Sequence, residues 1–122
     1  MRDAIKSLKA LSDETSIRVL NLVLQRECCV CEVMHALDIS QSKASRHLSS
    51  LYDAGFLKLR KDGLWSLYSV DEAGLKDYQT DLVNSVRKII KDYKLAQSDA
   101  ERLGKVKRRV LNDTDAVCVS EQ

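Results

Sequence analysis

The hydrophobic pattern of residues 30–70 constrains the fold most, because its period changes at one glycine, Gly55. Before Gly55, apolar residues recur every three or four positions, as they do on one face of a helix. After it, residues 56–70 alternate on either side of Asp62-Gly63, a pair that favours a hairpin turn between two strands. The sequence therefore predicts helices followed at once by a β-hairpin.

Polar residues mark where the helices begin. Residues 2–11 predict a first helix, and Ser12 predicts the N-cap of a second helix that ends near Arg26. A short third helix covers about residues 30–37, and Ser40 predicts the N-cap of a fourth. A short helix, a tight turn and a second helix form a helix-turn-helix, and a hairpin directly after it forms a wing. The predicted fold class is mainly α with a small β-hairpin: a winged helix-turn-helix.

A helix-turn-helix places its second helix in the major groove of double-stranded DNA, with its N-terminal residues at the base edges. That helix reads "SQSKASRHL" here, and glutamine and arginine pair with adenine and guanine respectively. An ordinary polar helix face is the alternative, but it does not explain the basic hairpin that follows. His47 fits a helix-packing contact as well as a base contact. The expected DNA-contacting residues are Gln41, Ser42, Lys43, Ser45, Arg46 and His47 on the helix, and Lys58, Arg60 and Lys61 on the hairpin.

The charge distribution supports contact with phosphates. The whole chain carries a formal net charge of +2. Residues 41–61 hold five basic residues and one acidic residue, a local charge of +4, while the rest of the chain sums to −2. Basic charge gathered in one short region is typical of nucleic-acid binding.

The C-terminal half predicts a dimer and a less ordered end. Apolar residues recur every three or four positions over residues 72–94, which predicts a long helix that forms the seam of a homodimer. Residues 97–113 predict one more helix with a basic end, and the last residues a loose tail. Residues 1–95 are expected to form the DNA-binding and dimerisation domain, and residues 96–122 a C-terminal helix and flexible tail.

Composition limits the class of protein. The 122 residues include no proline, and 44% are hydrophobic, as expected for a helical globular chain. No apolar stretch is long enough to cross a membrane, so we expect a cytoplasmic protein with reduced thiols and no membrane partner. No glycine-rich phosphate loop and no Ser/His/Asp pattern is present, and the chain is not expected to be an enzyme.

Three of the four cysteines, Cys28, Cys29 and Cys31, stand within four positions. Three clustered thiolates suit soft ions, whereas zinc usually takes four ligands and often histidine. On a helix, Cys28 and Cys31 lie on one face, while Cys29 and Cys31 point to nearly opposite sides. All three can bind one ion only if the helix start unwinds or has not yet begun.

The segments "LSDETSIRVLNLVL", "ECCVCEV" and "SQSKASRHLSSLYDAGFLKLRKDGLWSLYSV" resemble the ArsR/SmtB family of dimeric winged-helix repressors. The "CVC" at residues 29–31 resembles its arsenic- and antimony-responsive branch in particular. The resemblance, over about residues 3–95, implies a homodimer that binds operator DNA, requires no cofactor, and is released by As(III) or Sb(III). It implies cysteine ligands, here Cys28, Cys29 and Cys31.

Two points have alternatives: which residue supplies the third ligand of the ion, and which chemical signal releases the protein from DNA. Some family members carry a further cysteine where this chain has Met34. Cys28 takes that role in our prediction, and Cys118 is a second candidate if the tail brings it close. Thiol oxidation or persulfidation, or binding of cadmium or lead, are alternative signals for the same fold. A redox enzyme that uses the C-x-x-C pair, and cysteines that only pack, are further alternatives.

Overall fold

A computed structural model describes residues 1–112, 114 and 116–120. Six helices and four strands follow one another over these residues. They are α1 (Arg2–Ala10), α2 (Glu14–Gln25), α3 (Val30–Leu37), α4 (Gln41–Asp53), β1 (Leu57–Asp62), β2 (Trp65–Val70), α5 (Asp77–Lys91), α6 (Lys94–Gly104), β3 (Val106–Val110) and β4 (Ala116–Ser120). None of these helices is long and apolar enough to cross a membrane.

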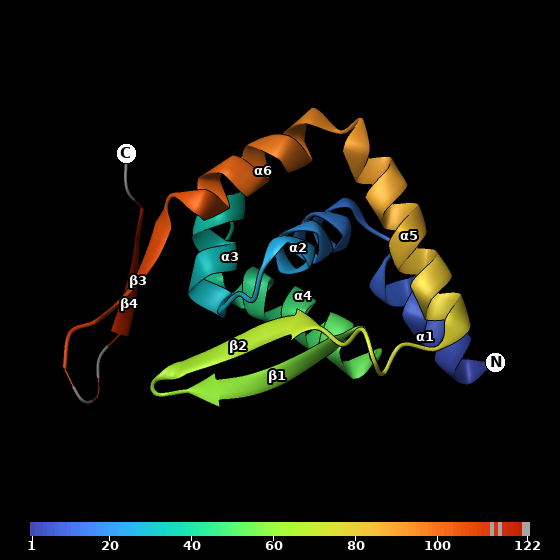
Figure 1. The fold of residues 1–122 in the computed structure, drawn as a ribbon, viewed down its shortest axis with the longest axis horizontal. Coiled ribbons are helices and arrows are strands. Elements are labelled where there is room, and N and C mark those ends of the chain that lie inside the picture. Colours follow the sequence, from blue (N-terminus) through green and yellow to red (C-terminus); the bar gives the residue numbers. More distant parts are fainter. Residues whose placement is uncertain (113, 115, 121–122) are drawn as a thin grey trace.

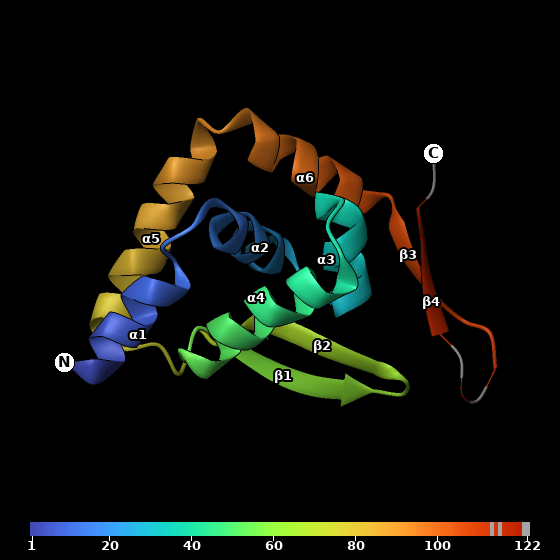
Figure 2. The same cartoon turned by 180° about the vertical axis from the view of Figure 1, so that it is seen from behind.

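Helix α2 lies at the centre of the molecule, surrounded by the other helices (Figure 1). The main core joins α2, α3 and α4 to the first hairpin, and its largest fully buried side chain is Phe56. Helix α5 runs beside α1, and α6 crosses over α2 and α3 (Figures 1 and 2). The β1–β2 and β3–β4 hairpins are separate two-stranded antiparallel sheets. The winged helix-turn-helix predicted from the sequence is confirmed.

The helix starts are partly as predicted. Ser40 is the N-cap of α4, where its hydroxyl accepts a hydrogen bond from the Lys43 N–H at 3.1 Å. The N-cap of α2 is Asp13 rather than Ser12, because the Asp13 carboxylate accepts the Ser16 N–H at 2.7 Å. The Ser12 hydroxyl instead donates to the Lys9 carbonyl at the end of α1.

Two glycines shape the entry to the wing and its turn. Gly55 has a φ of +92° after α4, and Gly63 has a φ of +59° in the hairpin. Both values lie where side chains are disfavoured and glycine is not. The hairpin is confirmed, but its two-residue loop is Gly63-Leu64, since Asp62 still pairs with Trp65 at the end of the ladder.

The C-terminal third differs from the prediction. The helix expected over residues 72–94 is shorter, because the chain turns before Asp77 and again between α5 and α6. The helix expected over residues 97–113 ends at Gly104, and β3 and β4 pair from Val106 opposite Ser120 onward. Residues 106–110 form a strand where a helix was predicted, and residues 116–120 form a strand where a loose tail was predicted. Residues 121 and 122 of the predicted tail lie outside the described residues. Val106 and Cys118 project from one face of the hairpin and are buried, whereas Val117 on the opposite face of β4 is exposed.

A buried carboxylate fixes α6 to the helix-turn-helix. Asp99 is fully buried and accepts hydrogen bonds from Arg18 at 2.8 and 2.9 Å and from Arg102 at 2.5 Å. Arg102 also donates to the Ala36 carbonyl at the end of α3. Asp99 therefore holds the C-terminal third against α2 and α3.

Replacing Asp99→Asn should lower the free energy of unfolding by about 3 kcal/mol, because it leaves the half-buried Arg18 guanidinium without its counter-charge. Urea denaturation followed by circular dichroism measures the change. Glu101→Gln, an exposed position of the same helix, is the matched control and should change stability by less than about 0.5 kcal/mol. Equal stability of the two variants would contradict the role of Asp99.

Candidate functional site

The segment that carries the clustered cysteines is paired with the wing through a single β-bridge. The Cys28 N–H donates to the Tyr68 carbonyl at 2.9 Å, and the Tyr68 N–H donates back at 2.7 Å. Side chains alternate between the two faces of an extended chain, so those of Cys28 and Cys29 point in opposite directions. The two neighbouring thiols therefore enter different surroundings.

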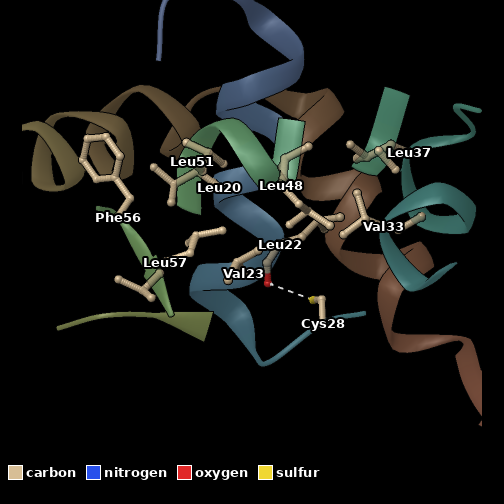
Figure 3. Close-up of a cluster of buried hydrophobic side chains, with 14 of the residues drawn as sticks. Leu20, Leu22, Val23, Cys28, Val33, Leu37, Leu48, Leu51, Phe56 and Leu57 are labelled. Atoms are coloured by element: carbon tan, nitrogen blue, oxygen red, sulfur yellow. Dashed lines mark hydrogen bonds between the residues drawn. The ribbon is translucent and has the colours of Figure 1, made fainter. Parts of the chain in front are cut away.

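Cys28 belongs to the main hydrophobic core. Its side chain is fully buried beside α2, with Sγ 3.8 Å from the Leu22 carbonyl oxygen (Figure 3) and 3.3 Å from that of Arg26. Burial raises the pKa of the Cys28 thiol to about 12, because the thiolate would lose its hydration. Cys28 packs as a small apolar side chain would.

Cys29 and Cys31 lie on the other side, at the start of α3. Cys29 is the N-cap and has an extended backbone, while Cys31 stands in the first helical turn. The opposite placement expected for residues 29 and 31 of a continuous helix does not apply, because the helix begins only at Val30. Both side chains belong to a small second cluster that includes Leu67 of the wing.

Cys118 joins this second cluster from β4. Its Sγ lies 3.7 Å from Cys29 Sγ, and the two side chains are 7% and 4% exposed. The contact with the Cys118 thiol, opposed by burial, lowers the pKa of Cys29. That same contact, with burial and the neighbouring Cys31, raises the pKa of Cys118. The two thiols can therefore share one proton, with either sulfur as the donor.

A buried glutamate holds the thiol segment in place. Glu32 is 1% exposed, and its Oε1 accepts the Cys29 N–H at 3.0 Å. Its Oε2 pairs with Arg26 Nη1 at 2.5 Å, and Arg108 Nε of β3 lies 3.8 Å from Oε1. One carboxylate therefore connects the end of α2, the start of α3 and the C-terminal hairpin.

The structure rearranges the set of cysteines expected from the sequence. Cys29 and Cys31 lie together, Cys28 lies apart from them, and Cys118 joins them. Among the described residues, no three Cys, His, Asp or Glu side chains already surround a common point. The valine alternation around Cys118 in "AVCVS" was the sequence signal for the strand that carries it.

The expected DNA-reading residues of α4 differ in exposure. Gln41, Ser42 and Arg46 are exposed, whereas Lys43 and Ser45 are half-buried. His47 is 8% exposed, and its Nδ1 lies 3.0 Å from Ser16 Oγ of α2. The packing alternative for His47 is therefore the one that this geometry favours.

The wing presents its three expected basic residues from β1. Lys58, Arg60 and Lys61 are all exposed. Arg60 makes two hydrogen bonds to Glu27, at 2.7 and 2.6 Å, which lower the pKa of that carboxyl. The Lys61 ammonium donates to Ser66 on β2 at 2.6 Å. Arg60 thus connects the wing to the residue just before the cysteines.

Comparisons with known proteins agree with this fold. Residues 13–64 match the model of the family described as bacterial regulatory protein, arsR family. The arsenic resistance transcriptional regulator ArsR1 of Pseudomonas putida is 48% identical over 49% of this chain and 48% of its own length. The arsenical resistance operon repressor of Bacillus subtilis is 32% identical over 59% of this chain and 70% of its own length. Both names describe regulators rather than enzymes, as the sequence predicted.

Solved structures show the same architecture. Reduced HlyU from Vibrio cholerae has a TM-score of 0.60 and 25% identity, over 72% of this chain and 88% of that one. The fold and the matches define a regulatory protein of the winged helix-turn-helix class. Within that class, the chain belongs to the ArsR family. It spans about half the length of several curated relatives that it matches.

The burial of His47 predicts a pH dependence of stability. Burial lowers the pKa of His47, with Arg46 and Lys43 acting in the same direction and Asp13 opposing them. The folded state then binds fewer protons than the unfolded state, so stability is complete above about pH 6.5 and falls as pH drops through the lowered pKa. His47→Gln should remove this part of the pH dependence in thermal unfolding between pH 7.5 and 5.

Ser16→Ala is the control, because it removes the partner at Nδ1 but keeps the imidazole buried. This variant should be less stable at every pH while retaining the decline toward acid. The role of His47 would be disproved if wild type and His47→Gln lost stability in parallel.

Proposed function

We propose that the chain is a dimeric repressor that leaves operator DNA when As(III) or Sb(III) binds cysteine thiolates at the start of α3. The observation that carries the proposal is the backbone pairing of Cys28 with Tyr68, beside Cys29 and Cys31. The segment that carries the thiols is thereby joined by backbone hydrogen bonds to the wing that would contact DNA. Family membership and the arsenical-resistance names of matched relatives support the choice of ligand.

The exposed part of α4 supports DNA reading. Gln41 and Arg46 project their side chains from its surface and suit adenine and guanine, while Ser42 and Lys43 suit phosphates. On the wing, Lys58, Arg60 and Lys61 suit the phosphate backbone or the minor groove. His47 positions α4 against α2 through Ser16 rather than meeting a base.

Exposed apolar side chains support the dimer. Ile5 and Leu8 of α1 are 43% and 51% exposed, and Ile89 of α5 is 54% exposed. Helices α1 and α5 lie side by side in both views (Figures 1 and 2). A second copy that covers these helices would bury this surface and place two α4 helices on a two-fold symmetric operator.

Release of DNA follows from the position of the thiols. A soft ion that gathers the thiolates displaces the backbone around Cys29, which is bonded to Glu32 of α3 and continuous with the strand pairing to Tyr68. Helix α3 packs on α4, so the change alters the placement of both α4 and the wing. The ligand favours the arrangement that does not fit DNA, and typical coupling of this kind is about 1–3 kcal/mol per site.

Oxidation is a second candidate signal, favoured by the 3.7 Å separation of Cys29 Sγ and Cys118 Sγ. Hydrogen peroxide would accept the two electrons and two protons of both thiols, forming one disulfide and two water molecules. Operator release by arsenite in full reductant, compared with peroxide alone, separates the two signals. Release by peroxide alone would replace the metalloid proposal with the redox one.

Arg46→Ala should weaken operator binding by about 1–3 kcal/mol and relax one base preference, because it removes an exposed guanidinium from α4. Fluorescence anisotropy with operator and single-base variants measures both effects. Lys94→Ala is the control, an exposed basic residue at the start of α6, a helix on the far side of α2 from the wing (Figure 1). An affinity equal to that of the control would remove Arg46 from the DNA-reading set.

Cys29→Ser and Cys31→Ser should each bind operator with wild-type affinity and fail to release it on addition of arsenite, because each loses a soft ligand. Operator binding with and without arsenite, under a phosphine reductant, is the measurement. Arsenite-induced release from either variant would show that its cysteine is not required for the response.

A further inference from the structure

We propose that the β3–β4 hairpin is part of the inducer site and that Cys118 supplies the third thiolate, beside Cys29 and Cys31. This inference rests on the proposed function and deepens it, since it assigns the ligand set of a trivalent metalloid. Cys28, although next in sequence, is a core residue and not a ligand.

The sulfur separation fits a shared ion. With a metal–sulfur bond of about 2.3 Å, two thiolates on one tetrahedral ion lie about 3.8 Å apart, and somewhat closer at the narrower angles of a pyramid. Cys29 Sγ and Cys118 Sγ are 3.7 Å apart without any rearrangement of the chain. Cys31 packs against the same cluster from the first turn of α3, so drawing its thiolate onto the shared ion would displace the start of that helix, as the proposed release of DNA requires.

The register of the hairpin directs Cys118 toward α3. Cys118 stands opposite Arg108, and opposite residues of an antiparallel pair project from the same face. Arg108 approaches the buried Glu32 carboxylate from that face, and Val106 packs beside Cys29 on it. The β3–β4 hairpin therefore packs against the start of α3, and Cys118 has a fixed position on the packed face of the hairpin.

Cys28 is held away by two sets of contacts. Its backbone is paired with Tyr68, and its side chain fills a position of the main core beside Leu22 (Figure 3). Bringing its sulfur to the Cys29 side would reverse the alternation of the strand and leave a cavity in the core. Cys118 already lies beside Cys29, so its sulfur can bind the same ion without leaving a cavity in the main core.

The inducer would therefore tie three parts of the molecule together. The thiol segment continues into α3 and pairs with the wing, and β4 would become bonded to both through the ion. In this arrangement the bound ion holds the C-terminal hairpin against the start of α3. Metalloid binding should consequently protect the backbone amides of β3 and β4 from hydrogen exchange, as well as those of α3.

The test counts sulfur atoms around bound arsenic in the full reduced chain. Arsenic X-ray absorption gives the number of As–S bonds, and calorimetry with arsenite gives the affinity. Wild type should show three sulfurs, and Cys118→Ser should show two with an oxygen in the third place. Loss of an outer-shell partner alone typically costs 10–100-fold, so Cys118→Ser should bind arsenite at least about tenfold more weakly.

Two controls separate the site from the scaffold. Cys28→Ala should keep three sulfurs and an affinity within about twofold of wild type, because alanine fills most of the same core position. Val117→Ser, on the outward face of β4, should also retain both values. If Cys28→Ala fails to fold, alkylation of native wild type decides the question: arsenite should protect Cys118 together with Cys29 and Cys31.

The outcomes distinguish the two proposals. If wild type binds arsenite and releases operator, but Cys118→Ser keeps three sulfurs or unchanged affinity, the third-ligand inference is overturned while the proposed function stands. If Cys28→Ala loses one sulfur, Cys28 is the ligand and Cys118 is not. If wild type binds no arsenite, both proposals fall.

Discussion

The pairing of Cys28 with Tyr68 is the interaction on which the arrangement of the site depends. It fixes the residues before α3 against β2 by a single β-bridge, and an extended chain sends successive side chains to opposite faces. One thiol enters the core, where it fills space, and the next enters a small cluster under the C-terminal hairpin. A continuous helix through these residues would have separated Cys29 from Cys31.

Buried carboxylates connect the elements that surround this segment. Glu32 holds the Cys29 backbone and meets cationic side chains from α2 and β3, while Asp99 holds α6 against α2. Each carboxylate is inaccessible to water and is matched by arginine, so each fixes one relative placement of the elements it joins. The thiol cluster therefore sits where movement of one element changes the contacts of several others.

The sequence predicts correctly those features of the fold that depend on residues close together in the chain. Ser40 as the N-cap of α4, the glycine at the end of that helix and the hairpin that follows are short-range features. Even so, the N-cap of α2 is one residue later than predicted, because Asp13 accepts the helix N–H while Ser12 turns back to α1. The exposure of Arg46 and the burial of His47 follow from packing of α4 on α2.

The sequence by itself determined the winged helix-turn-helix, its basic face and the presence of a soft-ligand cluster, because periodicity, capping and residue chemistry are local properties. Only the tertiary structure decided which cysteines meet. Cys118 lies 89 residues from Cys29 in the chain, and the two are brought together by the pairing of β3 with β4, the packing of α6 on α3 and the burial of β3 against α3. Long-range contacts of this kind are selected by the packing of the whole chain, so a pattern read along the sequence cannot rank Cys118 above the adjacent Cys28.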